Sequence, residues 1–457
     1  MKRLWSITGG LLGLLALGAL VVALALTFGE LQREVKPASQ AFQSPIETPT
    51  QPPYPPPATP TPSSPPATPT VAPPLIPRCT FAAPSVPAEP GPSLDVYQFS
   101  EPRVVLTHTS AIGIAGWLAD GQQLLITRDI PGANRNSIDV LNIRTSELST
   151  YAEREGNSGK PVWLPAFGAV AYVTLVEEER HEQRISYRPE LWISYGNPQQ
   201  VERLAPDVMG LSLAVEPDGN HLWYFSRSEP DRPQVFDGES RVIQTAPWNV
   251  AAWKYPKPDL EWAMRDRSPQ FTMAWHPDGT RVVLYSQFWT FLLDVKTNRV
   301  CELTLGEYKP EAMDIPPWPL EAQWSPDGRY LAFITTDSLD MPFRRTELTI
   351  LDMATGERRT LSPGSDIEPG RHFVTDIAWA PNGQMLAVLA TVEYRDGTTW
   401  EGLYLVEATT GQNKHLLPHI VFPAGDFGWN LAWSPNGDSL AVTCLYGPLC
   451  LIEVTWP

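Results

Sequence analysis

A five-residue phrase that recurs through most of the chain constrains its fold more than any other feature. The clean copies are Trp275-His-Pro-Asp-Gly279, Trp324-Ser-Pro-Asp-Gly328, Trp379-Ala-Pro-Asn-Gly383 and Trp433-Ser-Pro-Asn-Gly437. Two weaker copies and a degenerate one are Trp117-Leu-Ala-Asp-Gly121, Val215-Glu-Pro-Asp-Gly219 and Trp163-Leu-Pro-Ala-Phe-Gly168. The steps between successive final glycines are 47, 51, 60, 49, 55 and 54 residues. Seven copies at this regularity predict a repeat protein built from one structural unit per copy.

Each copy of the phrase lies among four short runs with β-strand character. One run precedes the tryptophan, and a second follows the glycine, as in Leu331-Ala-Phe-Ile334. A third run, such as 346–352, leads through the turn Thr355-Gly-Glu into a fourth, Arg359-Thr-Leu361. Four strands joined by turns make an antiparallel four-stranded sheet, and seven such sheets in succession make a propeller. The sequence therefore predicts an all-β fold, a seven-bladed β-propeller of four-stranded antiparallel blades.

The repeated residues suit structural roles in a tight turn between two strands. Proline fixes φ, Asp or Asn binds its own backbone, and glycine accepts a positive φ, while tryptophan fills the gap between neighbouring blades. A catalytic or calcium-binding role for the repeated aspartates is the alternative, but Asn382 and Asn436 replace them in two copies. We therefore assign structural roles to Trp117, Gly121, Trp163, Gly168, Gly219, Trp275, Gly279, Trp324, Gly328, Trp379, Gly383, Trp433 and Gly437.

The phrase Trp-Ser-Pro-Asp-Gly followed by Arg-Tyr-Leu-Ala-Phe, at 324–333, resembles the TolB-type, WD-repeat-like β-propeller family. The resemblance covers residues 93–457 and implies a scaffold that binds a protein or another ligand. Related propellers precede the hydrolase domain of prolyl-oligopeptidase-like enzymes. This chain shows neither the N-terminal α/β domain of TolB nor a hydrolase domain after the propeller. We therefore expect neither a translocation role nor a peptidase role.

Ring closure is also predicted from the sequence. The last unit ends one strand short, and the segments Asp95–Phe99 and Arg103–Thr107 resemble an orphan strand placed before the first repeat. We expect this strand to complete the final blade, which removes two open sheet edges.

The N-terminal 36 residues contain an apolar run from Leu4 to Phe28, long enough to cross a bilayer as a helix. Lys2 and Arg3 precede the run, so the positive-inside bias predicts a cytoplasmic tip, a single transmembrane anchor and an extracytoplasmic propeller. A cleaved signal peptide is the alternative, because Ala23-Leu24-Ala25 offers small residues at the required spacing.

Residues 37–92 hold 20 of the 49 prolines, mostly with Thr, Ser and Ala. Because proline fixes φ and removes a hydrogen-bond donor, we expect an extended, disordered linker that pairs with no sheet. The chain carries a net charge of −17, and the residues beyond this linker alone carry −18. That charge argues against nucleic acid as a partner and favours a cationic or metal-bridged one.

The four cysteines allow two disulfides, which an extracytoplasmic location would permit. Cys444 and Cys450 flank a short loop between two expected strands, so their pairing is balanced evenly against two free thiols. A bond between Cys79 and Cys301, attaching the linker to the outer strand of a blade, is less favoured.

Catalytic motifs and metal-binding motifs are not recognisable, so we expect no cofactor and no metal site, and enzymatic activity stays uncertain. Long loops at one end of the expected channel are rich in aromatic residues and arginine, which suits a binding patch, although the rings could merely pack the loops down. The candidate ligand-binding residues are Trp262, Arg265, Arg267, Trp318, Arg345, Arg371, Trp400 and Trp429. The favoured function is a membrane-tethered binding or scaffold module for a protein, peptide or glycan. The alternatives are a carbohydrate-active lyase or glycosidase and a structural envelope component.

Overall fold

The computed structural model describes residues 76–81 and 93–456, apart from gaps of one to three residues and longer gaps at 254–269, 306–317, 337–344, 364–370 and 424–428. The chain separates into two compact units, of which the second begins at Val71 and contains all the described residues. No helix in this described part is long and apolar enough to cross a membrane. The predicted anchor and most of the predicted linker lie outside the described residues.

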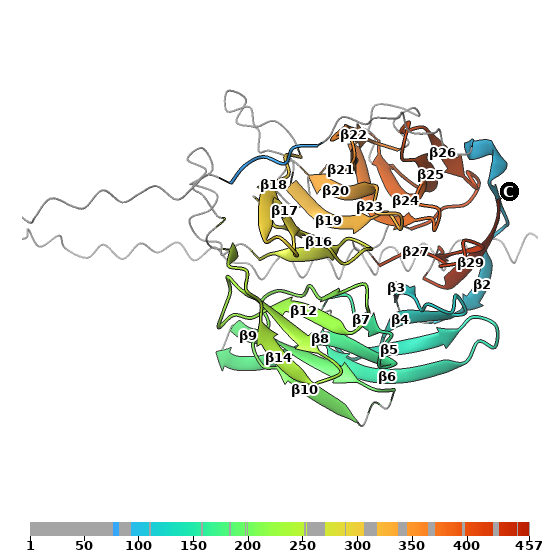
Figure 1. The fold of residues 1–457 in the computed structure, drawn as a ribbon. Helices are drawn as coiled ribbons and strands as arrows, with labels where there is room; N and C mark the ends of the chain where they lie inside the picture. The colour runs from blue at the N-terminus through green and yellow to red at the C-terminus, as the bar shows by residue number, and fades with distance from the viewer. Residues whose placement is uncertain are drawn as a thin grey trace, which may run out of the picture. The chain divides into compact units, whose positions relative to one another are not determined.

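The described part is almost entirely β-structure, with one short 3-10 helix, η1 (Leu94–Val96) (Figure 1). Four separate four-stranded antiparallel sheets follow one another along the chain. They consist of β3 (Ile112–Trp117), β4 (Gln123–Asp129), β5 (Arg135–Asn142) and β6 (Leu148–Glu155); β7 (Val162–Leu164), β8 (Ala169–His181), β9 (Arg184–Ser194) and β10 (Val201–Ala205); β11 (Ala214–Val215), β12 (His221–Phe225), β13 (Pro233–Asp237) and β14 (Val242–Thr245); and β15 (Thr272–Trp275), β16 (Arg281–Tyr285), β17 (Thr290–Asp294) and β18 (Arg299–Glu302).

The remaining strands form two larger sheets. An eight-stranded sheet contains β19 (Trp318–Trp324), β20 (Tyr330–Thr336), β21 (Thr346–Asp352), β22 (Arg358–Leu361), β23 (Arg371–Trp379), β24 (Met385–Glu393), β25 (Thr399–Glu407) and β26 (Asn413–Leu416). A five-stranded sheet contains β27 (Leu431–Trp433), β28 (Ser439–Thr443) and β29 (Leu449–Thr455) with β1 (Gln98–Phe99) and β2 (Arg103–Leu106).

The described residues thus form an all-β propeller, but its sheets differ from the seven separate four-stranded blades that the repeats predict. Five sheets stand separately, and two successive repeats share the sixth. The physical reason is one parallel bridge between Thr346 of β21 and Phe373 of β23, supported by the Thr346 hydroxyl, which donates to the Val374 carbonyl at 2.8 Å.

The core of the propeller is divided among the contacts between successive sheets. In the described part, seven clusters of buried apolar side chains each join the strands of one repeat to those of the next. One of them packs Ile114 of β3 against Ala441 of β28, so the first and last repeats are neighbours. Strands such as β20 are buried at every position because both faces of the sheet are covered. The core therefore continues around a closed ring.

The repeated phrase forms the turn after each innermost strand. All seven of its glycines have positive φ, between 59° and 81°, which glycine adopts without strain. The carboxylate of Asp327 accepts a hydrogen bond from the backbone N–H of Arg329 at 3.0 Å, as expected of a turn residue. The Trp324 indole donates to the Ala274 carbonyl of the preceding sheet at 3.0 Å, and Trp117 donates likewise to Ala432 at 2.9 Å. These two tryptophans therefore connect neighbouring blades, whereas the Trp433 indole donates to Gly437 of its own turn at 3.2 Å.

The last sheet is completed by residues from before the first repeat. Both β1 and β2 pair antiparallel with β29, in the registers Phe99↔Val454 and Val104↔Cys450. The two pieces follow one edge of β29 and are interrupted near Pro102, whose missing N–H prevents continuous pairing. The predicted ring closure is therefore present.

The end of the predicted linker also belongs to the folded unit, contrary to the expectation that it pairs with no sheet. Arg78 bridges Glu302 at the edge of β18, and the Cys79 N–H donates to the Glu302 carbonyl at 3.0 Å. Phe81 packs with the apolar side chains between β15–β18 and β19–β22. Apolar side chains in this part of the linker thus pack against the propeller. We call residues 76–81 the strap.

Both disulfides are formed. Cys79 of the strap is bonded to Cys301 of β18, with 4.9 Å between the Cα atoms, although the sequence ranked this pair second. Cys444 is bonded to Cys450 of β29, with 5.9 Å between the Cα atoms. No free cysteine occurs among the described residues.

Candidate functional site

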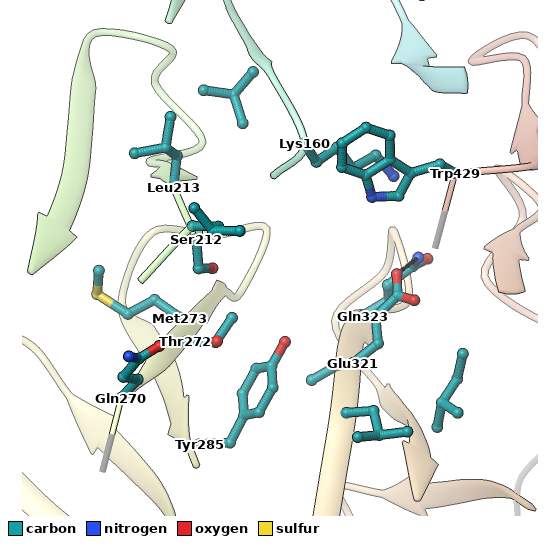
Figure 2. A pocket seen from close by; sticks show the side chains of 15 residues that line it. Lys160, Ser212, Leu213, Gln270, Thr272, Met273, Tyr285, Glu321, Gln323 and Trp429 are labelled. Atoms are coloured by element: carbon teal, nitrogen blue, oxygen red, sulfur yellow. Dashed lines mark hydrogen bonds between the residues drawn. The ribbon is translucent and has the colours of Figure 1, made fainter. Parts of the chain in front are cut away.

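A cavity of about 560 Å³ opens where the innermost strands begin. Its walls come from the starts of innermost strands in five repeats, together with the ends of β16 and β20 (Figure 2). The lining residues are Lys160, Val162, Leu211, Ser212, Leu213, Gln270, Thr272, Met273, Tyr285, Leu320, Glu321, Ala322, Gln323, Ile334 and Trp429. Because innermost strands surround the axis of a propeller, this cavity is the mouth of the central channel. We call it the channel-mouth pocket.

Several polar residues of the pocket occupy one repeated sequence position, three residues before the first residue of the turn phrase. That position holds a polar residue in six of the seven repeats; the full set is Ile114, Lys160, Ser212, Thr272, Glu321, Asp376 and Asn430. Four of these residues line the pocket, with Glu321 on the β19 side and Thr272 on the β15 side (Figure 2). Four of the seven repeats therefore contribute the residue at this position to the pocket, whereas Ile114 and Asp376 are completely buried.

β-Bulges shift the register beside both acidic residues of this set. The bulge in β19 lies between Pro319 and Glu321, and the one in β23 lies between Val374 and Asp376. A bulge changes the direction of the following side chains, and bulges are frequent next to functional sites. Glu321 accepts a hydrogen bond at 2.7 Å from the amide of Gln323, another residue of the pocket lining.

Asp376 lies behind the pocket lining and is completely buried. Its carboxylate accepts the backbone N–H groups of Ile377 at 2.8 Å and Asn430 at 2.6 Å. Burial, followed by repulsion from Glu321, raises the pKa of Asp376 to about 7, although Lys160 and the two hydrogen bonds act in the opposite direction. A proton therefore binds close to the channel within the physiological pH range.

Trp429 contributes an indole ring to the pocket lining. Gly113 of β3 allows its close approach, since a Cβ atom at that position would lie 3.0 Å from the indole ring. The buried guanidinium of Arg154 lies 5.8 Å from the centre of the same ring, and its Nε donates to Asn136 at 2.7 Å. Burial lowers the pKa of Arg154 to about 10, which leaves the group charged at neutral pH. Trp429 is thus held by β3 and by a cation.

Five of the eight candidate binding residues from the sequence lie among the described residues. Trp429 lines the pocket, whereas Arg345 pairs with Glu347 at 2.8 Å and Trp400 packs against His415 with 5.9 Å between ring centres. Trp318 and Arg371 begin β19 and β23. Trp262, Arg265 and Arg267 lie outside the described residues.

The channel-facing residues were missed, although the sequence contained a signal for them. Their signal was the recurrence of polar residues at a fixed distance before each turn phrase. That position belongs to an otherwise apolar innermost strand, where a polar side chain needs a partner or a ligand. The prediction relied instead on loop composition, and most of those loops lie outside the described residues.

The stability of the protein should depend on the protonation of Asp376. Its pKa in the folded state, about 7, exceeds the ordinary value of 3.8. The folded state therefore retains a proton that the unfolded state loses above pH 4. This contribution is fully present below pH 4 and is lost as the pH rises through 7. Between pH 5 and pH 8 we expect a loss of a few kcal/mol in the free energy of unfolding, measured by urea denaturation.

Two variants isolate this contribution from that of other titrating groups. Burial lowers the pKa values of His372 and His415, and these histidines favour unfolding as the pH falls, so wild type alone is not decisive. Asp376→Asn should show a flatter pH dependence than wild type. Glu321→Gln should move the titration to lower pH because it removes a repelling charge. Identical pH profiles for wild type and Asp376→Asn would contradict the assignment.

No protein-family model matches the chain, and no curated protein sequence matches it. Among solved structures, it is similar to TolB from Acinetobacter baumannii, with 15% identity and a TM-score of 0.36, covering 72% of this chain and 78% of that one. It is also similar to a TolB candidate from Agrobacterium tumefaciens, with 14% identity and a TM-score of 0.38, covering 71% and 99%. Both of these solved structures are named as TolB, the family type that the repeated phrase resembles.

Proposed function

We propose that the protein is a binding module whose channel-mouth pocket takes up part of a protein or peptide partner. The observation that carries this proposal is the pocket itself, in which Trp429 offers apolar contact area beside Glu321 and Lys160. A few polar groups converging on a partly apolar cavity are typical of ligand sites. The excess of acidic residues in the chain favours a partner that presents a basic side chain.

The ring that carries this pocket has seven blades in our proposal. The eight-stranded sheet consists of two antiparallel four-stranded sets, β19–β22 and β23–β26, joined by a single bridge. A separate cluster of buried side chains, including Tyr330 and Val388, packs between these two sets, as between any other neighbouring sheets. Counted in this way, every repeat of the turn phrase contributes one blade.

The location that we propose is the extracytoplasmic face of a membrane. Support comes from the sequence of residues 1–36, with its apolar run and preceding basic residues, and from a Pro-rich linker that would hold the propeller away from the bilayer. The two disulfides agree with an oxidising compartment.

A glycosidase or lyase using the same pocket is the second candidate, because Glu321 and Asp376 are two nearby carboxyl groups in different environments. The geometry favours binding over catalysis. Asp376 has no exposed surface, and two backbone N–H groups occupy its carboxylate, so the group cannot reach a glycosidic bond. Release of reducing ends from cell-envelope glycans by wild type, abolished in Asp376→Asn, would instead support the enzyme.

Capture experiments with pocket variants test the binding proposal. Immobilised wild-type protein should retain a partner from solubilised envelope extract, and Trp429→Ala should reduce that affinity by at least about fivefold, since truncating a central aromatic residue commonly costs more than about 1 kcal/mol. Glu321→Gln should weaken binding of a basic partner and reduce its dependence on salt.

Tyr187→Ala is the matched control, because Tyr187 is an aromatic residue with 42% exposure and lies outside the pocket lining. This variant should retain the partner as wild type does. Equal retention by wild type and Trp429→Ala, with both melting at the same temperature, would refute the pocket as the binding site.

A further inference from the structure

The turn after β11 differs from the other repeated turns in carrying three potential metal ligands. Asp218 is its ordinary turn aspartate, and the carboxylate accepts the Asn220 N–H at 2.8 Å. Glu216 takes the second position of the phrase, where the other copies have Leu118, Leu164, His276, Ser325, Ala380 and Ser434. His221 lies two residues after the glycine, where the other copies have Gln123, Val170, Arg281, Tyr330, Met385 and Ser439. Both changes occur in the same repeat, and the turn itself requires neither of them.

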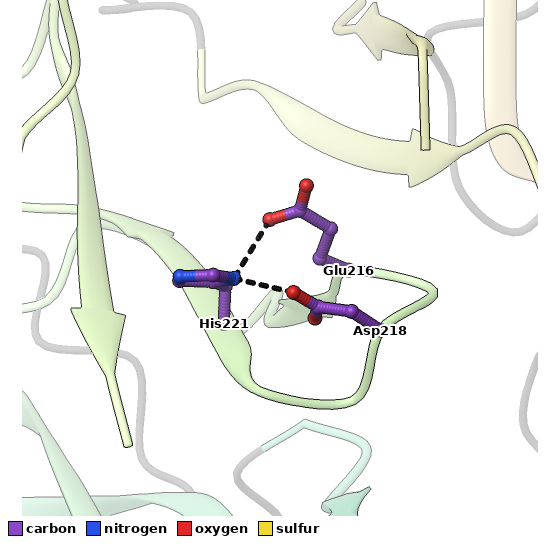
Figure 3. A group of neighbouring side chains, drawn as sticks. All are labelled: Glu216, Asp218 and His221. Carbon is purple, nitrogen blue, oxygen red and sulfur yellow. Dashed lines mark hydrogen bonds and ion pairs between the residues drawn. The ribbon is translucent and has the colours of Figure 1, made fainter. Parts of the chain in front are cut away.

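The three side chains converge on one point (Figure 3). The Nδ1 atom of His221 lies 2.7 Å from an oxygen of Asp218 and 3.2 Å from an oxygen of Glu216. All three ligand atoms lie within 4.8 Å of one another. In a tetrahedral zinc site with bonds of 2.0–2.1 Å, neighbouring ligand atoms are about 3.3 Å apart. Small side-chain movements would therefore bring the three atoms to bonding distance of one ion.

The surroundings hold Glu216 in place and leave the cluster open to solvent. The Trp223 indole N–H lies 3.4 Å from the same Glu216 oxygen, and Trp223 stacks on Trp248 with 4.7 Å between ring centres. The side chains of Asp218 and His221 remain 46% and 31% exposed. Outer contacts of this kind orient metal ligands, and the exposure leaves room for water or a further ligand on the ion.

We propose that Glu216, Asp218 and His221 bind a divalent transition-metal cation of the zinc type. Two carboxylates balance the charge of such an ion, and an imidazole nitrogen favours zinc over calcium or magnesium, which prefer oxygen ligands. The site lies at the end of β11, whereas Ser212 and Leu213 of the channel-mouth pocket precede the start of that strand. The proposed metal site is therefore distinct from the pocket. It differs from the sequence-based expectation that the chain has no metal site.

Metal titration of the full chain tests the proposal. After treatment with a chelator, the protein should bind one equivalent of Zn²⁺ by isothermal titration calorimetry. Bound Co²⁺ should give the visible absorption of a low-symmetry site. Glu216→Gln and His221→Gln should each weaken Zn²⁺ binding by at least about 100-fold, because even outer contacts of metal sites account for 10–100-fold in affinity. Ca²⁺ should not compete.

Asp120→Asn is the matched control. Asp120 has the same turn role, accepting the Gln122 N–H at 2.9 Å, but no glutamate or histidine occupies the two neighbouring ligand positions. This variant should bind Zn²⁺ as wild type does, as should the pocket variant Trp429→Ala, so that failure of the proposed function leaves this test intact. A wild-type chain that binds no Zn²⁺, or Glu216→Gln with unchanged affinity and an unchanged melting temperature, would overturn the proposal. So would equal affinities for Ca²⁺ and Zn²⁺.

Discussion

Deleting residues 93–108 is expected to lower the melting temperature of the entire propeller, although the deletion leaves every copy of the turn phrase in place. These residues form the outer edge of the last sheet, where β1 and β2 pair with β29. Without them, β29 becomes an open edge with unpaired backbone groups. Since each sheet packs on two neighbours, the loss spreads beyond one blade.

The side-chain contacts at this closure give the size of the effect. Tyr97 is 3% exposed, its hydroxyl accepts a hydrogen bond of 2.6 Å from Asn382, and its ring stacks on Trp456. Val105 is buried between the first and last repeats. Truncating a buried aromatic residue costs about 3–5 kcal/mol, and the loss of a buried valine adds roughly 1–2 kcal/mol. Since total stabilities are about 5–15 kcal/mol, the double variant Tyr97→Ala/Val105→Ala should be largely unfolded on mild heating.

The point variants avoid a complication of the deletion, which would shorten the connection between Cys79 and the first repeat. Val96→Ala is their control, because Val96 is 38% exposed and adjacent to Tyr97, and its truncation should change stability by less than about 0.5 kcal/mol. Calorimetry gives the measurement. If the double variant melted at the wild-type temperature, the closing strand would have no role in holding the ring together.

Loss of the Cys79–Cys301 disulfide should produce the second large effect. The bond closes a loop between residues 222 positions apart, which restricts the unfolded chain strongly. The chain-entropy relation gives about 5 kcal/mol for such a loop, so Cys79→Ala/Cys301→Ala should lose about 4–5 kcal/mol of unfolding free energy. Urea denaturation of the variant beside oxidised wild type measures this difference.

The other disulfide is a control within the same molecule. Cys444 and Cys450 are only six positions apart, for which the same relation gives about 2 kcal/mol. Cys444→Ala/Cys450→Ala should therefore be the more stable of the two double variants. The reverse order, or no loss in either, would contradict the chain-entropy argument.

Much of the fold could be predicted because each turn phrase carries its own local physics. Gly328 has a positive φ, the Asp327 carboxylate accepts a backbone N–H, and the Trp324 indole donates a hydrogen bond to the preceding sheet. These three residues lie close together in the sequence. Ring closure followed from counting strands in the last unit. These features depend on neighbouring residues in the sequence and on the number of strands, and both can be determined from a single sequence.

The features that could not be predicted depend on distant contacts. The merging of two repeats into one sheet rests on Thr346 meeting Phe373, which strand patterns do not encode. The bond from Cys79 to Cys301 joins segments separated by four repeats. The contact between the rings of Trp400 in β25 and His415 in β26 likewise depends on the pairing of two strands, which the aromatic composition of the loop does not indicate.

The covalent attachment of the strap also determines where mechanical force enters the molecule. Tension applied through residues before Cys79 passes through the sulfur–sulfur bond directly to β18, in the middle of the ring. While this bond is intact, the force reaches the sheet of the fourth repeat before it reaches β1 and β2, which complete the last sheet. Reduction of the disulfide would instead bring the force to β1, which pairs with β29.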